Sequence, residues 1–183
     1  GTAPFGSNTV DATEVRRILT NQLAPLTDRR LVMNPDAEAN ALNLRAFQDA
    51  SWTGDTQAII QGRLNERLGF GFWMDQNVVT HTAGTVTGLL VNNGAGYAAG
   101  TKTIATDTGS GTLVAGDIIT FAGHNQTYAV VSSVGGGTIT SVTFEPGLAV
   151  AVTDNVAITR KASHVVNLAF HRDAIAFASR PFE

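Results

Sequence analysis

The feature that most constrains the fold is an abrupt change of composition near residue 86. Between Val86 and Thr159 the chain holds twelve of its 19 glycines but only five charged residues. Valine, threonine, isoleucine and alanine fill short runs such as TKTIAT, GDIITFAG, QTYAVVSSV and GTITSVTF, with glycines about every ten residues. This spacing is typical of small antiparallel barrels and sandwiches, so residues 86–159 are predicted to form a β-barrel-like domain of about five or six strands. Pro146 is expected to mark a strand end.

The residues before this block have helical patterns and more charge. Asp11 and Glu14 resemble a capping box at the start of a helix that ends before Pro25. Arg30 to Met33 is predicted to be a short strand. Asn34 and Pro35 then favour the start of a second helix, which continues to about Leu44 or Phe47.

A third helix and a further strand complete this first part. The helix is expected over Ala58 to Leu64, with Asp55 as its cap. The stretch LGFGFWMDQNVVTHTAGT, residues 68–85, begins as a strand. Its alternation places Phe70, Phe72 and Met74 on a core face and Gly71, Trp73 and Asp75 on the other. The closing HTAGT is predicted to be a turn into the glycine-rich block.

The last segment, Ala162 to Glu183, regains charge and bulk. Val166, Leu168 and Phe170 alternate before His171–Asp173, and Ile175 alternates with Phe177, which favours a hairpin that rejoins the first part. A helix through HRDAIAFA is the alternative. The fold is therefore predicted to be α+β, with residues 1–85 as the main domain, 86–159 as an inserted barrel and 160–183 completing the main domain.

Composition excludes several classes of protein. The formal net charge of −3 and the absence of a lysine and arginine cluster argue against a nucleic-acid binder. The chain has no cysteine, which excludes disulfides, thiolate metal sites and cysteine nucleophiles. No apolar run approaches the roughly 18 residues of a membrane span, so no membrane association is expected. Asn125 begins a glycosylation triplet that is interpreted as chance. The low charged fraction of 15% suggests that part of the surface contacts other protein.

A glycine motif is the nearest approach to a cofactor site. Gly94, Gly96 and Ala99 satisfy a GxGxxA spacing, and Asp117 follows about twenty residues later. A dinucleotide site needs a helix to begin at these glycines. The following GTKTIATDTGSG predicts strand and turn instead, so the glycines are assigned to β-turns and no cofactor is expected.

The remaining polar residues give no convergent catalytic pattern. The four histidines, at positions 81, 124, 164 and 171, have no second histidine or acid at ligand spacing, although the fold could still bring two of them together. Ser110 lies in TGSGT and not in a GxSxG elbow. Adjacent His171, Arg172 and Asp173 cannot converge on one point of a strand or helix. We therefore expect no catalytic, cofactor-binding or metal-binding residues and no enzymatic activity.

Arginines and aromatic residues are the candidates for contacts between subunits. The arginines are Arg16 with Arg17, Arg29 with Arg30, and Arg63 with Arg67, near Glu14, Asp28 and Glu66. Solvated salt bridges are the simpler interpretation, and docking onto neighbouring subunits is the alternative. Trp52, Trp73 and Phe182 are possible interface anchors, although core packing is favoured for Trp73.

Four segments together resemble the major coat (capsid) proteins of short-tailed temperate bacteriophages and their prophage relatives. They are LAPLTDRRLVMNP, LGFGFWMDQNVVTHTAGT, TLVAGDIITFAG and HVVNLAFHRDAIAFASRP, with DQNVVTHTAGT and NLAFHRDAIAFASRP as the most specific parts. The resemblance implies the tailed-phage major capsid fold, of which this chain would be the axial-domain portion with its inserted β-barrel. An N-terminal arm, an extended loop and a long spine helix would be expected upstream. No catalytic residues are implied.

The predicted function is that of a structural subunit that self-assembles into an icosahedral capsid enclosing DNA. The expected partners are copies of itself, a scaffolding protein and a portal. DNA would be enclosed and not specifically bound. The expected locations are the virion and, during assembly, the host bacterial cytoplasm. The alternative is a β-rich tail, fibre or carbohydrate-binding module that uses the loops of Gly88 to Gly123, with Tyr97, Phe121 and Tyr128 as its candidate aromatic platform.

Overall fold

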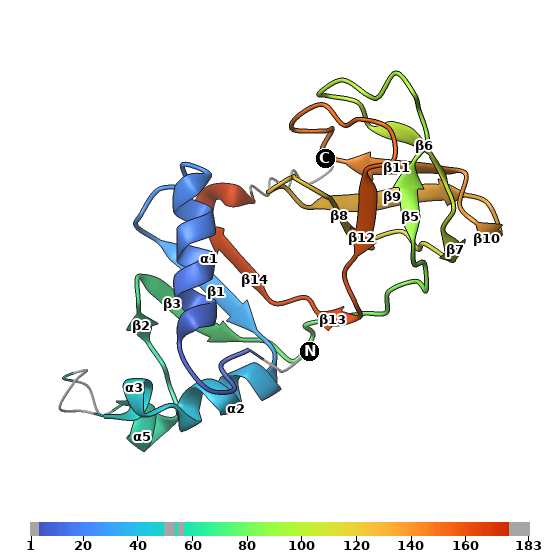
Figure 1. The fold of residues 1–183 in the computed structure, drawn as a ribbon. Coiled ribbons are helices and arrows are strands. Elements are labelled where there is room, and N and C mark those ends of the chain that lie inside the picture. Colours follow the sequence, from blue (N-terminus) through green and yellow to red (C-terminus); the bar gives the residue numbers. More distant parts are fainter. Residues whose placement is uncertain (1–3, 50–53, 55–56, 176–183) are drawn as a thin grey trace, which may run out of the picture. The chain divides into compact units, whose positions relative to one another are not determined.

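The computed structural model describes residues 4–49, 54 and 57–175 and has a mixed α+β fold in which strands predominate (Figure 1). The chain divides into two compact units: unit 1 contains residues 1–79 and 165–183, and unit 2 contains residues 80–164. Unit 2 is therefore longer at both ends than the inserted domain predicted for residues 86–159. Residues 80–85 and 160–164 join unit 2 because their contacts are with one another and with the barrel.

Unit 1 contains the described helices. These are α1 (Val10–Asn21), α2 (Pro35–Asn43), α3 (Arg45–Gln48) and α5 (Gln57–Gln61). Pro35 begins α2 as predicted, and the helix breaks at Leu44, whose backbone is extended. Asp11 is not the cap expected for α1. It lies in the first turn, and its carboxylate accepts a hydrogen bond from the Phe5 amide at 2.8 Å. The proposed cap Asp55 lies outside the described residues.

A four-stranded sheet forms the rest of unit 1, in the order β14 (Leu168–His171), β1 (Arg29–Met33), β3 (Phe70–Met74) and β2 (Glu66–Arg67). β1 is parallel to β3 and antiparallel to β14. The predicted return of the last segment to the first part is confirmed by this pairing. Helix α1 crosses one face of the sheet (Figure 1). The buried core includes Leu31, Met33, Phe47 and Phe70.

The end of the chain follows neither predicted form completely. β14 is the first strand of the expected hairpin, but a short 3-10 helix, η1 (Arg172–Ala174), comes after it. The possible second strand or longer helix extends beyond Ile175, outside the described residues. The predicted core face of β3 is right for two of its three residues. Phe70 is buried and Phe72 packs against the core, whereas Met74 is exposed at the strand end.

Unit 2 contains a closed antiparallel barrel of six strands, which confirms the predicted architecture. Its order is β11 (Ser141–Glu145), β6 (Thr103–Asp107), β5 (Leu89–Val91), β12 (Ala157–Arg160), β8 (Ile118–Phe121) and β9 (Tyr128–Val134). β11 ends directly before Pro146, as expected. Alternate side chains fill the interior, where Phe121, Tyr128 and Phe144 have ring centroids 5.3–5.4 Å apart. Inward-facing residues of this kind give the barrel its own core.

Two pairs of short strands accompany the barrel. β7 (Ser110–Gly111) pairs with β10 (Gly137–Thr138), and β4 (Thr80–His81) pairs with β13 (His164–Val165). The second pair joins the segments through which the chain enters and leaves unit 2. The predicted turn HTAGT is therefore a strand end followed by irregular chain that leads to the barrel.

Candidate functional site

One face of the sheet in unit 1 is open to solvent. The register places Arg30 and Val32 of β1 beside Trp73 of β3 and beside Leu168 and Phe170 of β14 on this face. These five residues are called the open sheet face below. Trp73 is 56% exposed and Leu168 is 51% exposed, and the other three side chains are half-buried. The open sheet face is therefore an apolar surface with one cation.

The position of Trp73 corrects the prediction that it lies in the core. Trp73 falls on the face opposite to Phe70 and Phe72, because successive residues of a strand point to opposite sides. The guanidinium carbon of Arg30 lies 5.6 Å from the centroid of the Trp73 ring. A side chain at Gly71 would contact both groups, so the glycine leaves room for them to meet. Trp52 and Phe182, the other proposed anchors, lie outside the described residues.

A hollow of about 810 Å³ adjoins Trp73 and Arg30. Two arginines and two glutamates line it, so its charges are mixed in sign. The lining residues are Arg30, Met33, Glu38, Arg63, Leu64, Asn65, Glu66, Gly71, Phe72, Trp73 and Met74. A hollow with mixed charge around an exposed tryptophan is better matched to a protein partner than to a strongly anionic ligand.

The predicted arginine pairs have different environments. Arg17 forms an exposed ion pair with Glu14 at 2.7 Å, as a solvated salt bridge would. Arg29 contradicts that interpretation, because it is only 1% exposed. Its guanidinium donates to the carbonyl oxygens of Pro25 and Ala24 at 2.7 and 2.8 Å. Arg29 therefore fixes the loop that follows α1, and its contact with the Thr20 hydroxyl at 3.1 Å ties that loop to the last turn of the helix.

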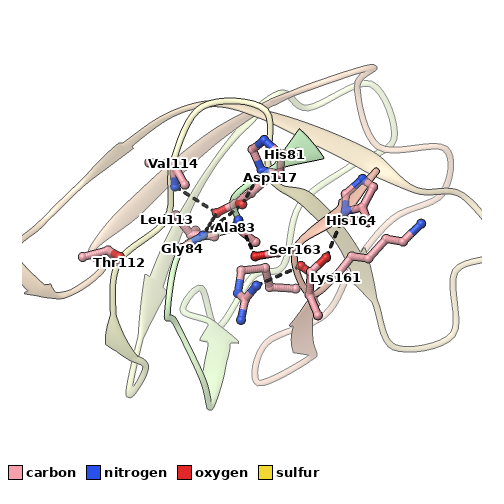
Figure 2. Close-up of polar contacts among 12 residues, drawn as sticks. His81, Ala83, Gly84, Thr112, Leu113, Val114, Asp117, Lys161, Ser163 and His164 are labelled. Atoms are coloured by element: carbon pink, nitrogen blue, oxygen red, sulfur yellow. Dashed lines mark hydrogen bonds and ion pairs between the residues drawn. The ribbon is translucent and has the colours of Figure 1, made fainter. Parts of the chain in front are cut away.

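A second polar centre lies in unit 2 and is called the Asp117 cluster: Asp117, His81, Gly84 and Val114 (Figure 2). The Asp117 side chain is fully buried. It accepts hydrogen bonds from the amides of Gly84 at 3.1 Å and Val114 at 2.9 Å. Nε2 of His81 lies 2.8 Å from its Oδ1 atom. The carboxylate thus joins the entry segment to the turn before β8.

His164 lies beside this cluster. Its ring centroid is 5.7 Å from that of His81, and its Nδ1 lies 2.9 Å from the carbonyl oxygen of Ala162. Ser163 accepts a hydrogen bond from the Ala83 amide at 3.0 Å. Sequence reasoning missed this contact, because 83 positions separate the two histidines. The pairing of β4 with β13 brings them together.

The other histidines remain apart from this centre. Nδ1 of His124 lies 2.9 Å from the hydroxyl of Tyr128, and His171 accepts a hydrogen bond from the Asp173 amide. Within the described ranges, no group of three or more histidine, aspartate or glutamate side chains could hold a metal ion. None of the described helices has the length and apolar character needed to cross a membrane.

The glycine motif forms turns, as predicted. Gly94 and Gly96 lie between β5 and β6, where no helix follows them, and Gly96 has a φ of +68°. The Asp117 carboxylate is buried and bonded within the Asp117 cluster, so it is not available to bind a ribose hydroxyl. The proposed aromatic platform is not on the surface either. Phe121 and Tyr128 are buried in the barrel, and the Tyr97 hydroxyl accepts a hydrogen bond from Ala105.

Comparison of the chain with protein-family models gives no match, and comparison with curated protein sequences gives no significant match.

Proposed function

We propose that this chain is a structural subunit of an icosahedral bacteriophage or prophage capsid that self-assembles into the DNA-enclosing shell. In this proposal the chain has the tailed-phage major capsid fold and supplies its axial-domain portion with an inserted barrel. The sequence resemblance supports the proposal. The interruption of unit 1 by a closed barrel is also the arrangement that the resemblance implies.

The open sheet face is the observation that carries the proposal. Tryptophan and arginine are enriched among the residues that dominate the energy of protein interfaces. Here Arg30 lies over Trp73, and Leu168 adds an exposed apolar group two strands away. Exposed apolar patches on a monomer mark surfaces that meet other molecules. A shell repeats each contact by symmetry, so individually weak contacts become strong together.

The partners in this proposal are further copies of the chain, a scaffolding protein and a portal. DNA is enclosed without sequence-specific contact, and the chain has no enzymatic activity. The assembled protein resides in the virion, after assembly in the host bacterial cytoplasm.

The experiment expresses the gene product that contains this chain, alone and together with the genes that flank its own. Sedimentation and negative-stain electron microscopy should detect shells or shell-like polymers. Trp73→Ala should reduce the assembled fraction at least tenfold. Because Trp73 is more than half exposed, the circular dichroism and unfolding midpoint of the unassembled chain should remain unchanged.

Val134→Ala is the matched control. Val134 is an apolar strand residue of unit 2 that is 63% exposed, so its truncation tests general loss of surface hydrophobicity. It should assemble like the unaltered protein. If the unaltered protein assembles neither alone nor with the flanking gene products, the capsid proposal is wrong. Normal assembly of Trp73→Ala would instead exclude only the open sheet face as a main contact.

A carbohydrate-binding module is the less favoured function. Such a module needs aromatic rings that stack on a sugar, and two of its three candidates are inside the barrel. Specific binding on a glycan array would reverse this preference.

A further inference from the structure

We propose that His81 and His164 form a binding site for one divalent transition-metal ion, with Cu²⁺ the most strongly bound. The site would join β4 to β13 at the base of the barrel. This inference rests on the geometry of unit 2 alone and does not depend on the proposed function.

The contacts of His81 fix which of its nitrogens is available. Asp117 accepts hydrogen bonds from two backbone amides, so its carboxylate acts as an acceptor toward His81 as well. Nε2 of His81 therefore carries the hydrogen that is donated to Oδ1. In the neutral ring, Nδ1 then has a lone pair that can bind a metal.

His164 is fixed in the complementary way. The carbonyl oxygen of Ala162 can only accept, so Nδ1 of His164 donates to it at 2.9 Å. Nε2 then holds the free lone pair. Neither Nδ1 of His81 nor Nε2 of His164 has a hydrogen-bond partner among the residues that the structure describes.

This pattern is the usual outer shell of a metal-binding histidine. Such a residue donates its second ring N–H to a carboxylate or a backbone carbonyl, which sets the tautomer and orients the ring. His81 uses the buried carboxylate of Asp117, and His164 uses the carbonyl of Ala162 (Figure 2). Each of the two rings therefore already has one hydrogen bond that orients it.

The separation of the rings suits one shared ion. Metal–nitrogen distances of about 2 Å place the centroids of two imidazoles on one ion roughly 4.5 Å apart at a right angle and roughly 6.4 Å apart when the two nitrogens lie on opposite sides of the ion. The observed centroids are 5.7 Å apart, with 58° between the ring planes. Gly116 leaves space beside the available nitrogen of His81, since a Cβ at that position would lie 3.5 Å from Nδ1.

The two imidazole ligands determine which metal ions the site prefers. Imidazole suits copper, nickel and zinc, and affinity for nitrogen sites is greatest for Cu²⁺ in the divalent series. No third protein ligand is available in the described part of the chain, so water would complete the coordination. Bound metal would hold the entering and leaving strands of unit 2 together and reduce their local opening.

The test titrates the whole chain with Cu²⁺ and follows binding by electron paramagnetic resonance. One ion per chain with two imidazole nitrogens is expected. His164→Gln should remove one nitrogen from the spectrum and weaken binding at least tenfold. His171→Gln removes an imidazole from unit 1 and should leave both the spectrum and the affinity unchanged. At the same Cu²⁺ concentration, the unfolding midpoint of the unaltered protein should rise by more than that of His164→Gln.

A second measurement needs no substitution. In the unaltered protein, substoichiometric Cu²⁺ should broaden the imidazole resonances of His81 and His164 before those of His124 and His171. A spectrum unchanged in His164→Gln, equal weakening in His171→Gln, or broadening that begins at other histidines would each overturn the proposal.

Discussion

The Oδ1 atom of Asp117 lies 2.8 Å from Nε2 of His81, although 36 positions separate the two residues. The same carboxylate also accepts hydrogen bonds from the backbone amides of Gly84 and Val114. One buried acid therefore fixes the segment that enters unit 2 against the turn that begins β8. This contact helps to explain why unit 2 begins at Thr80 and not at residue 86.

Replacement of Asp117 should destabilise unit 2 selectively. Asp117→Ala leaves two amides and His81 without their acceptor, at a cost of about 2–4 kcal/mol. Asp117→Asn keeps one acceptor oxygen and should lose less. Both tyrosines lie in unit 2 and both tryptophans in residues 1–79, so the two units have separate optical signals. In urea, the tyrosine near-ultraviolet signal should shift while tryptophan fluorescence keeps its midpoint.

A glycine pair in the same unit tests how closely the backbone approaches this cluster. A Cβ at Gly84 would overlap the carbonyl oxygen of Thr112 and lie 2.9 Å from Oδ2 of Asp117. Gly84→Ala should therefore cost about 1–3 kcal/mol through overpacking. A Cβ at Gly94 meets nothing within 4 Å, and its φ is outside the left-handed region. Gly94→Ala should be neutral or stabilise by up to about 1 kcal/mol, because it restricts the unfolded chain. Equal losses in urea denaturation would contradict this assignment.

The sequence predicted the barrel because its signal is local. Runs such as GDIITFAG and QTYAVVSSV alternate inward and outward residues between glycine turns, and they became β8 and β9. The sequence could not predict the Asp117 cluster. Its partners come from the entry segment and a turn, and they meet only when six strands close. Nothing in the local pattern distinguishes Asp117 from a solvated turn acid.

Two errors in unit 1 have a similar origin. Alternation correctly placed Trp73 opposite Phe70, but the pattern alone does not say whether a second layer covers that face. Core packing was therefore the wrong prediction for Trp73, which is exposed. The nearness of Asp28 to Arg29 in the sequence favours a solvated salt bridge, and that prediction is wrong because Arg29 is buried. Its burial depends on carbonyl groups of the loop after α1, which accept its hydrogen bonds inside unit 1.

Replacement by methionine should destabilise unit 1 at Arg29 but not at Arg17. Arg29→Met keeps much of the buried volume but leaves the carbonyls of Pro25 and Ala24 without their donor, at a cost of about 2–4 kcal/mol. Arg17 is exposed, and the hydrogen bond and charge of Glu14 raise the pKa of its guanidinium. Solvent screens this pair, so Arg17→Met should leave the urea midpoint unchanged. Tryptophan fluorescence provides the measurement for both. A comparable loss in Arg17→Met would show that the exposed pair contributes more than its geometry indicates.

Leu23 offers a substitution that should stabilise unit 1. It follows α1 with a φ of +61°, a left-handed conformation that costs residues with a Cβ about 1–2 kcal/mol. Its side chain is 91% exposed, so little packing would be lost. Leu23→Gly removes the strain, and the greater freedom of glycine in the unfolded chain offsets part of the gain. The expected net stabilisation is up to about 1 kcal/mol, measured by tryptophan fluorescence in urea. Ile18→Gly is the control: it lies within α1 and is also exposed, so it should destabilise by about 1 kcal/mol. If both substitutions lower the midpoint, Leu23 does not hold strain that glycine can relieve.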